Sequence, residues 1–213
     1  MQVSERVKKD TAYRQVERVL VVDDDPGVRT MLNIILSREN HVVVGMASNG
    51  SQAIQAMGTC APSLMLLDLD MPCMEGLATL RELRQRYPWL PVLVLSMLDP
   101  NIYALRCARL GARGFLNKGE HAPLLPEMIE QMRRGVMLFP SQMTKGDLPF
   151  SAWSDRELIA LRSLVRGGDA NSIATTLMVS QETANKLRRR LFTKLGLATD
   201  EALIQAGRDL RLC

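Results

Sequence analysis

Apolar residues in the first two thirds of the chain fall into five short runs, each bounded by polar or turn-forming residues. The runs cover residues 18–22, 41–44, 63–67, 91–96 and 113–117. Short apolar runs with such boundaries are typical of strands that are buried on both faces of a parallel sheet. We therefore expect five strands in this part of the chain.

The segments between these runs have the spacing of amphipathic helices. They cover residues 26–39, 50–58, 75–87, 101–110 and 123–134. Strands that alternate with helices of this length predict an α/β domain with a doubly wound, five-stranded parallel sheet. Five such units fit one domain of about 120 residues. We place it at residues 18–139, after an N-terminal extension over residues 1–17.

Polar side chains stand at the ends of four of the five expected strands. They are Asp23 with Asp24, Asp68, Ser96 and Lys118. The working site of an open α/β sheet lies beyond the carboxyl ends of its strands, so we expect these groups to converge on one crevice. Carboxylates that lie so close together favour a cation among them. Mg²⁺ fits, with Asp24 and Asp68 as direct ligands and Asp23 acting through water.

This set of residues predicts phosphoryl transfer. Once a cation neutralises the crevice, one carboxylate can attack phosphorus as a nucleophile. Lys118 and the Ser96 hydroxyl can hold the phosphoryl oxygens. A single Asp at a strand end is more often a turn former or a helix cap, and Asp25 before Pro26 fits that simpler interpretation. Turns alone do not explain polar residues at four strand ends.

The rest of the chain is expected to be a linker and a helical domain. Residues 140–150 include glycine and proline and show no periodicity, which is typical of a linker. In residues 151–213, Ser154 and Glu157 form a capping box ahead of an apolar helix face. Further helices are expected over residues 170–177, over residues 181–195 and from about Thr199 onward.

A turn of three residues joins the helices at 170–177 and 181–195, which predicts a helix-turn-helix. On the second of these helices, Ala184, Leu187, Leu191 and Leu195 fall on one face and are expected to pack inward. The opposite face is basic, as in a helix that enters the major groove of DNA. The candidate DNA contacts on this face are Asn185, Lys186, Arg189 and Arg190, with Arg188 and Lys194 on its flanks.

Charge also separates the two parts of the chain, whose net charge is +4. Residues 18–139 contain 12 Lys and Arg against 12 Asp and Glu, whereas residues 140–213 contain 11 against 8. This difference favours different partners for the two parts.

The motifs of residues 18–139 resemble the receiver domain of two-component response regulators. The matching segments are Val21-Val22-Asp23-Asp24, Asp68 with Met71-Pro72 and Gly76, Val94-Leu95-Ser96, and Gly114-Phe115-Leu116-Asn117-Lys118. The resemblance implies a flavodoxin-like fold and a sensor histidine kinase that phosphorylates Asp68. It also implies Mg²⁺ held by Asp24, Asp68 and the backbone carbonyl of Asp70, with Lys118 at the phosphoryl group and a switch pair of Ser96 and Phe115. The side chain of Asp70 adds a carboxylate whose effect on phosphate lifetime the sequence leaves open.

Residues 151–213 resemble the LuxR-type helix-turn-helix. The matching segments are Arg156-Glu157, Ile173-Ala174, Val179-Ser180, Thr183 and Lys194-Leu195-Gly196. Joined to the receiver, they make the chain similar to a response regulator of the NarL/FixJ type. The resemblance implies that Thr183 is among the contacts to double-stranded promoter half-sites. It also implies a homodimer of the phosphorylated chain, with Leu203 and Ala206 of the last helix at the dimer contact.

Some positions depart from the usual LuxR-type pattern and leave alternatives open. Ser172, Asn185 and Leu187 stand where that family usually has Glu, Lys and His, so the preferred DNA sequence is not inherited. One alternative is an adaptor that binds proteins through a helical domain that no longer contacts DNA. Another is an enzyme that uses the acidic crevice on an external substrate, but no further catalytic constellation supports it, and we expect no enzyme.

Composition limits the cellular context. No apolar stretch approaches the roughly 18 residues that a membrane span needs, and residues 1–17 lack the apolar core of a signal peptide. The cysteines show no C-x-x-C spacing, which indicates reduced thiols rather than disulfides or a zinc site. They are Cys60, Cys73, Cys107 and Cys213. We expect a cytoplasmic protein that makes no membrane contact.

Overall fold

A computed structural model of the chain describes residues 16–71, 76–121, 124–140 and 153–209. Most of the expected N-terminal extension and of the expected linker lies outside these residues, as do Pro72, Cys73 and Cys213. The elements of the first part are β1 (Arg18–Val22), α2 (Pro26–Arg38), β2 (Val42–Ala47), α3 (Gly50–Cys60), β3 (Leu64–Leu67), α4 (Gly76–Arg86), β4 (Val92–Ser96), α5 (Pro100–Arg109), β5 (Gly114–Asn117), α6 (Lys118–His121) and α7 (Leu125–Arg133). Strands and helices alternate as the apolar pattern predicts.

The five strands form one parallel sheet in the order β2-β1-β3-β4-β5. The strand order reverses beside β1, because β2 lies on one side of it and β3 on the other. The carboxyl ends of β1 and β3 therefore flank the switch point at which open α/β sheets place their sites. The predicted doubly wound parallel sheet is confirmed.

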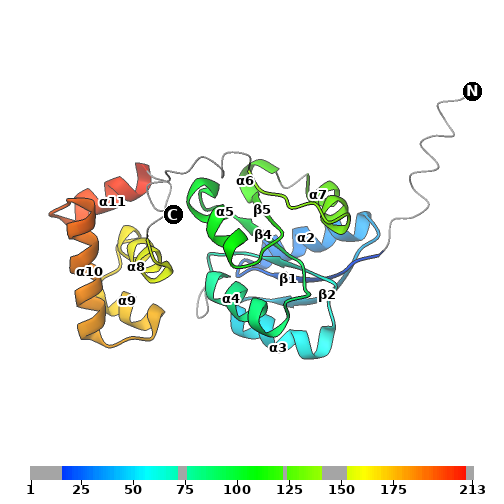
Figure 1. Cartoon of the computed structure of the whole chain (residues 1–213), viewed down its shortest axis with the longest axis horizontal. Helices are drawn as coiled ribbons and strands as arrows, with labels where there is room; N and C mark the ends of the chain where they lie inside the picture. The colour runs from blue at the N-terminus through cyan, green and yellow to red at the C-terminus, as the bar shows by residue number, and fades with distance from the viewer. Residues whose placement is uncertain (1–15, 72–75, 122–123, 141–152, 210–213) are drawn as a thin grey trace, which may run out of the picture.

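Helices cover both faces of this sheet. Figure 1 shows α2 and α7 on one side of the strands and α3 and α4 on the other. Alternate residues of β1 follow these two layers: Val19 and Val21 pack with α2 and α7, and Leu20 and Val22 pack with α3, α4 and α5. Side chains of successive strand residues point to opposite faces, so a strand between two helical layers must be apolar throughout.

Local capping explains where several helices begin. Asp25 is the N-cap of α2, and its Oδ1 accepts hydrogen bonds from the amides of Gly27 at 2.7 Å and Val28 at 3.3 Å. Pro26 occupies the first turn, where its missing N–H costs nothing. The simpler interpretation of Asp25 as a helix cap is therefore correct.

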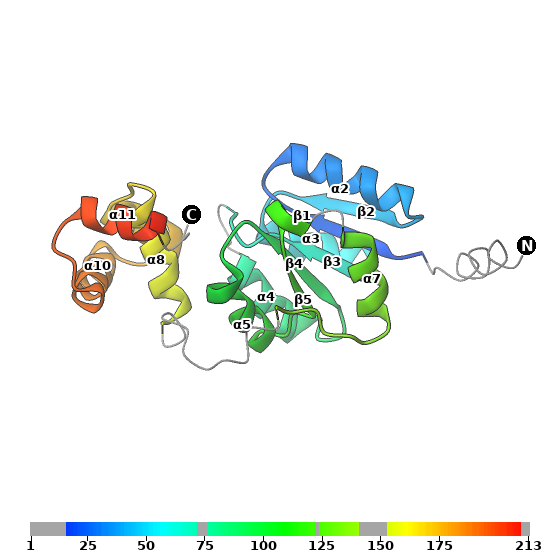
Figure 2. The same ribbon diagram turned by 90° about the horizontal axis from the view of Figure 1, so that it is seen from above.

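The second part of the chain is helical throughout its described length. It consists of α8 (Asp155–Val165), α9 (Ala170–Leu177), α10 (Gln181–Leu195) and α11 (Asp200–Asp209). The predicted capping box is present, since Ser154 Oγ accepts from the amide of Glu157 and the Glu157 carboxylate accepts from the amide of Ser154. Figures 1 and 2 show these helices as a group beside the sheet, with α8 nearest to it.

Close packing of α11 against α8 corrects one expectation. Leu203 is 1% exposed and belongs to the core of the helical domain, so it is not available for a dimer contact. A side chain at Gly207 would clash with Val165, which shows how closely the two helices approach. Of the two residues expected at a dimer contact, only Ala206 is partly exposed.

Two further findings bear on the expected cellular context. Cys60 and Cys107 are free thiols, and burial raises the pKa of the Cys107 thiol. Among the described residues, no helix has the length and apolar character needed to cross a membrane.

Candidate functional site

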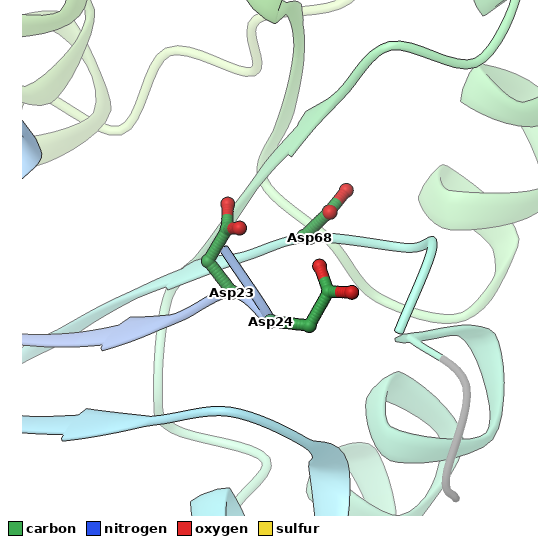
Figure 3. Close-up of side chains that lie close together, drawn as sticks. All are labelled: Asp23, Asp24 and Asp68. Carbon is green, nitrogen blue, oxygen red and sulfur yellow. The ribbon is translucent and has the colours of Figure 1, made fainter. Parts of the chain in front are cut away.

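Three carboxylates converge beyond the strand ends. Asp23 and Asp24 follow β1, Asp68 follows β3, and one oxygen from each lies within 4.8 Å of the others. Asp23 and Asp68 are only 2% and 5% exposed, whereas Asp24 faces solvent. Figure 3 shows the three side chains close together beyond the ends of the two strands. The convergence expected from the sequence is confirmed.

Lys118 bridges the two buried carboxylates. Its Nζ donates to Asp23 Oδ2 at 2.5 Å and lies 2.9 Å from Asp68 Oδ2. Burial raises the pKa of Asp23, and the hydrogen bond and charge of Lys118 offset that rise only in part. Burial would lower the pKa of Lys118, but the charges of Asp68 and Asp23 outweigh it and hold this pKa above its usual value. The pKa values of Asp23 and Lys118 thus depend on each other.

Backbone groups fix the orientation of the acidic side chains. The amide of Leu69 donates to Asp68 Oδ1 at 2.7 Å, and the amide of Asp25 donates to Asp23 Oδ1 at 3.0 Å. A side chain at Gly76 would clash with the backbone of Asp68, so glycine lets the start of α4 approach the end of β3. The carboxylates are therefore held in place by the fold itself.

The remaining strand-end residues lie at the same edge of the sheet. Ser96 ends β4 and is fully buried, and its Oγ accepts from the amide of Leu98 at 3.3 Å. Phe115 is buried in β5, next to β4 and three residues before Lys118. The structure thus places the hydroxyl and the aromatic ring on the neighbouring strands β4 and β5, and the ammonium group at the start of α6, directly after β5.

The charge balance of the crevice fits a divalent cation. Asp23, Asp24 and Asp68 contribute three negative charges, and Lys118 contributes one positive charge. Carboxylate oxygens are ligands that hard cations such as Mg²⁺ prefer, and a charge of +2 would balance the excess of two negative charges. The Asp23/Asp24/Asp68 group is a suitable acidic cluster for such an ion.

Asp70 makes contacts that sequence reasoning missed. Its carboxylate accepts hydrogen bonds from Arg162 and Arg166 of α8, which belong to the helical domain. Burial would raise the pKa of Asp70, but these two arginines outweigh it and hold the pKa below its usual value. One signal was present in the sequence. Arg162 lies four residues after Leu158, on the otherwise apolar face of α8, and a charge at such a position requires a partner.

The predicted helix-turn-helix consists of α9, a short turn and α10. Met178 caps α9 in the left-handed conformation at φ +52°, and the Ser180 side chain caps α10 by accepting from the amide of Thr183. Ala184 and Leu191 are fully buried on the inner face of α10. Leu187 and Leu195 are partly buried against the same core. The predicted inward face of this helix is confirmed.

The basic residues of α10 divide into two groups. Arg188 donates to both carboxylate oxygens of Asp200 at 2.7 and 2.8 Å, and its guanidinium lies 4.7 Å from the Phe192 ring centroid. Lys194 lies 3.1 Å from Glu157 Oε1 and 4.5 Å from the Trp153 ring centroid. Both side chains therefore hold α10 to its neighbours within the domain.

The other predicted DNA contacts lie on the outer side of α10. Thr183, Arg189 and Arg190 are exposed, and Asn185 is half-buried. Lys186 is exposed and pairs with Glu182 at 2.6 Å one turn earlier on the same helix. Arg190 also reaches Glu157 at 3.3 Å. This face is open to a partner, as a DNA-reading helix requires.

Comparison with known proteins agrees with the geometry. The family described as the response regulator receiver domain matches residues 19–130. A putative transcriptional regulator of Pseudomonas aeruginosa is 30% identical over 202 residues, which cover 91% of this chain and 98% of the relative. The virulence regulator BvgA of Bordetella pertussis is 29% identical, with 90% and 96% covered. The DNA-binding transcriptional activator EvgA of Escherichia coli is 26% identical, with 83% and 90% covered.

Solved structures match the whole architecture. RcsB of Salmonella typhimurium superimposes with a TM-score of 0.77 at 24% identity, covering 92% of this chain and 99% of that one. RcsB of Salmonella enterica bound to a promoter superimposes with a TM-score of 0.75 at 23% identity, with 89% and 97% covered. At this identity the likeness concerns the fold, which includes both the sheet and the C-terminal helices. The sheet order, the acidic cluster and the family match together show that the chain belongs to the family of response regulators that carry a receiver domain.

Proposed function

We propose that the chain is a phosphorylation-controlled, DNA-binding transcriptional regulator of a two-component system. Its parts are an extension over residues 1–17, a receiver domain over 18–139, a linker over 140–150 and a DNA-binding domain over 151–213. The observation that carries the proposal is the pair of buried carboxylates bridged by Lys118 at the switch point of the sheet. The relatives named transcriptional regulators support the same function, and the proposal includes no separate enzymatic activity.

In this proposal, Asp24, Asp68 and the backbone carbonyl of Asp70 hold Mg²⁺, and Asp23 acts through water. The ion supplies charge neutralisation as the phosphoryl group approaches the acidic crevice. Asp68 attacks phosphorus with one carboxylate oxygen, the bond from phosphorus to the histidine nitrogen of the kinase breaks, and an aspartyl phosphate forms. Lys118 already contacts Asp68 and can turn to a phosphoryl oxygen.

Ser96 and Phe115 would change their contacts in response to the new phosphoryl group. The Ser96 hydroxyl can hydrogen-bond a phosphoryl oxygen, and Phe115 then repacks beneath the space that Ser96 has left. These shifts favour one state of the face formed by α5, β5 and α7. We propose that the phosphorylated receivers pair through this face and bring two DNA-binding domains to promoter half-sites.

We propose a smaller set of DNA contacts on α10 than the sequence alone suggests. Thr183, Asn185, Lys186, Arg189 and Arg190 remain candidates, because they lie on the outer side of the helix. Arg188 and Lys194 are better explained as structural residues, since each is engaged by an acidic partner and an aromatic ring. Arg and Lys pair with phosphates or guanine, and Asn185 can read adenine.

The proposal is tested by phosphorylation of the purified chain and by genome-wide DNA binding. We expect that Asp68→Asn accepts no phosphate from a small phosphodonor and shows no phosphodonor-dependent gain in DNA binding. Glu82→Gln, which removes a partly exposed carboxylate on α4 and outside the proposed pairing face, serves as the matched control and should behave as the wild type. If labelled phosphate enters the Asp68→Asn variant, then Asp68 is not the phosphate acceptor. Binding to no discrete DNA site in either state would favour the protein-binding adaptor.

A further inference from the structure

The carboxylate of Asp70 joins the receiver domain to the DNA-binding domain. Asp70 lies two residues after Asp68, on the loop that follows β3. Its two oxygens accept from different arginines, Oδ1 from Arg162 and Oδ2 from Arg166. Arg162 is 4% exposed, so its charge is almost entirely removed from water and depends on this contact. A single receiver carboxylate thus pairs with the guanidinium groups of both Arg162 and Arg166.

A second acidic residue anchors the other end of the same helix. Asp155 begins α8 and pairs with Arg81 of α4 and with Arg106 of α5 at 3.1 Å. Arg106 also donates to the backbone carbonyl of Trp153. The two domains therefore meet through ion pairs at both ends of α8, at Asp155 and at Arg162 with Arg166.

A cavity lies between the two domains at the Asp70 end. Its volume is about 750 Å³, and its wall includes Asp24, Asp70 and Met71 from the receiver and Arg162, Arg166 and Thr176 from the helical domain. Asp24 also belongs to the acidic cluster. The same cavity therefore borders both the proposed metal ligands and the interdomain ion pairs.

We propose that Asp70, Arg162 and Arg166 form an interdomain clamp, and that a divalent cation bound at the acidic cluster weakens it. The proposal rests on the Mg²⁺ site of the proposed function. A cation near Asp24 and Asp68 adds two positive charges close to Asp70. These charges attract the Asp70 carboxylate and repel both guanidinium groups, and the repulsion is strong where water is partly excluded. Asp70 would therefore contact the cation through its backbone carbonyl and the two arginines through its carboxylate.

Because the two equilibria are linked, the strength of the clamp can be measured through the affinity of the chain for the cation. If the cation weakens the clamp, then opening the clamp must strengthen cation binding by the same factor. Cation binding alone, before any phosphorylation, would then favour separation of the two domains. Phosphorylation would act on an equilibrium that the metal has already shifted.

The test measures the Kd of Mg²⁺ and the radius of gyration of the full chain. Arg166→Gln removes a half-exposed arginine of the clamp, which the fold tolerates better than loss of the buried Arg162. We expect it to bind Mg²⁺ about fivefold more tightly, at the low end of couplings between sites. Isothermal titration calorimetry gives the Kd. Small-angle X-ray scattering at constant ionic strength should show expansion on addition of Mg²⁺ to the wild type.

Two further variants separate a clamp from a simple change of local charge. Arg156→Gln removes an exposed arginine from the same helix and should leave the Kd unchanged. Asp155→Asn removes a negative charge, so a purely local charge effect would weaken Mg²⁺ binding. The clamp predicts the opposite sign, because loss of the Asp155 anchor makes domain separation easier.

The outcomes distinguish the clamp from the metal site on which it rests. Equal Kd values in all four proteins, with no expansion on addition of Mg²⁺, would overturn the clamp and leave the metal site standing. Absence of Mg²⁺ binding in the wild type would overturn the metal site and the clamp together. Tighter binding in both Arg166→Gln and Asp155→Asn would establish the clamp.

Discussion

Glu157 joins three parts of the helical domain although it is one residue of a helix cap. Its carboxylate accepts from the Ser154 amide at 2.7 Å, from Lys194 at 3.1 Å, and it lies 3.3 Å from Arg190. Burial would raise the pKa of Glu157, but the hydrogen bonds from Ser154 and Lys194 hold it below its usual value. The residue therefore ties the start of α8 to the end of α10.

The first prediction concerns the stability that this carboxylate provides. Glu157→Gln should lower the free energy of unfolding at neutral pH by about 2 kcal/mol, since a charged and buried acceptor is lost. A folded pKa below the unfolded value of 4.5 means that the stabilisation is complete above pH 4.5 and is lost as the pH falls through the folded pKa. Urea unfolding at several pH values should show the two proteins converging in acid. A constant difference down to pH 3 would contradict this account.

The sequence was sufficient to predict site residues whose hydrogen-bond partners are near in the chain or that follow directly after a strand. Asp25 and Ser154 are caps whose bonds span two or three residues, so the local pattern was sufficient. Asp23, Asp24 and Asp68 were found because strand ends in a parallel sheet share one edge. The pairing of Asp70 with Arg162 joins positions 92 residues apart. No local rule gives the orientation of two domains, so this contact required the structure.

At the scale of elements, α10 carries basic residues with two different roles. Arg188 holds Asp200 at the start of α11 and stacks on Phe192, whereas Arg189 is exposed on the outer side of the helix. The two residues are neighbours of the same type in one run of arginines. Only their directions around the helix, about 100° apart, separate them.

The second prediction compares these neighbouring arginines. Arg188→Ala should lower the free energy of unfolding by about 1 kcal/mol through loss of the ion pair and the ring contact. Arg189→Ala should leave stability unchanged, weaken DNA binding and reduce the slope of log Kd against log salt by about 1. Thermal unfolding and titration with promoter DNA at several salt concentrations measure both. If Arg189→Ala binds DNA as the wild type does, this side chain does not contact DNA.

The elements themselves were predicted well where burial is uniform. β1, β3, β4 and β5 differ from their expected ranges by one residue at most, because strands between two helical layers are apolar throughout. β2 extends three residues further, to Ala47. Gly45 interrupts the apolar run of this edge strand, so the pattern did not extend the strand to Met46 and Ala47. The short α6 was also missed, since four residues show no helical period.

At the scale of the whole molecule, charged contacts hold the two domains together. Arg81 and Arg106 meet Asp155, and Arg162 and Arg166 meet Asp70. Arg162 also lies 6.0 Å from the ring centroid of Tyr103. Arg81 and Arg166 are half-exposed, and exposed ion pairs contribute little at physiological salt. Arg106 and Arg162 are largely buried, so their charges depend more strongly on Asp155 and Asp70.

The last prediction follows from this dependence on charge. Raising the salt concentration from about 0.05 M to about 1 M shortens the screening length severalfold and weakens exposed ion pairs. We expect the radius of gyration of the full chain to increase over this range. The circular dichroism spectrum should stay unchanged, because the ion pairs that weaken join the two domains rather than the turns within any helix. Asp155→Asn should reach the same expansion at lower salt, since it removes the shared partner of Arg81 and Arg106. An unchanged radius of gyration at every salt concentration would mean that apolar contacts, not ion pairs, hold the domains, because such contacts strengthen rather than weaken as salt rises.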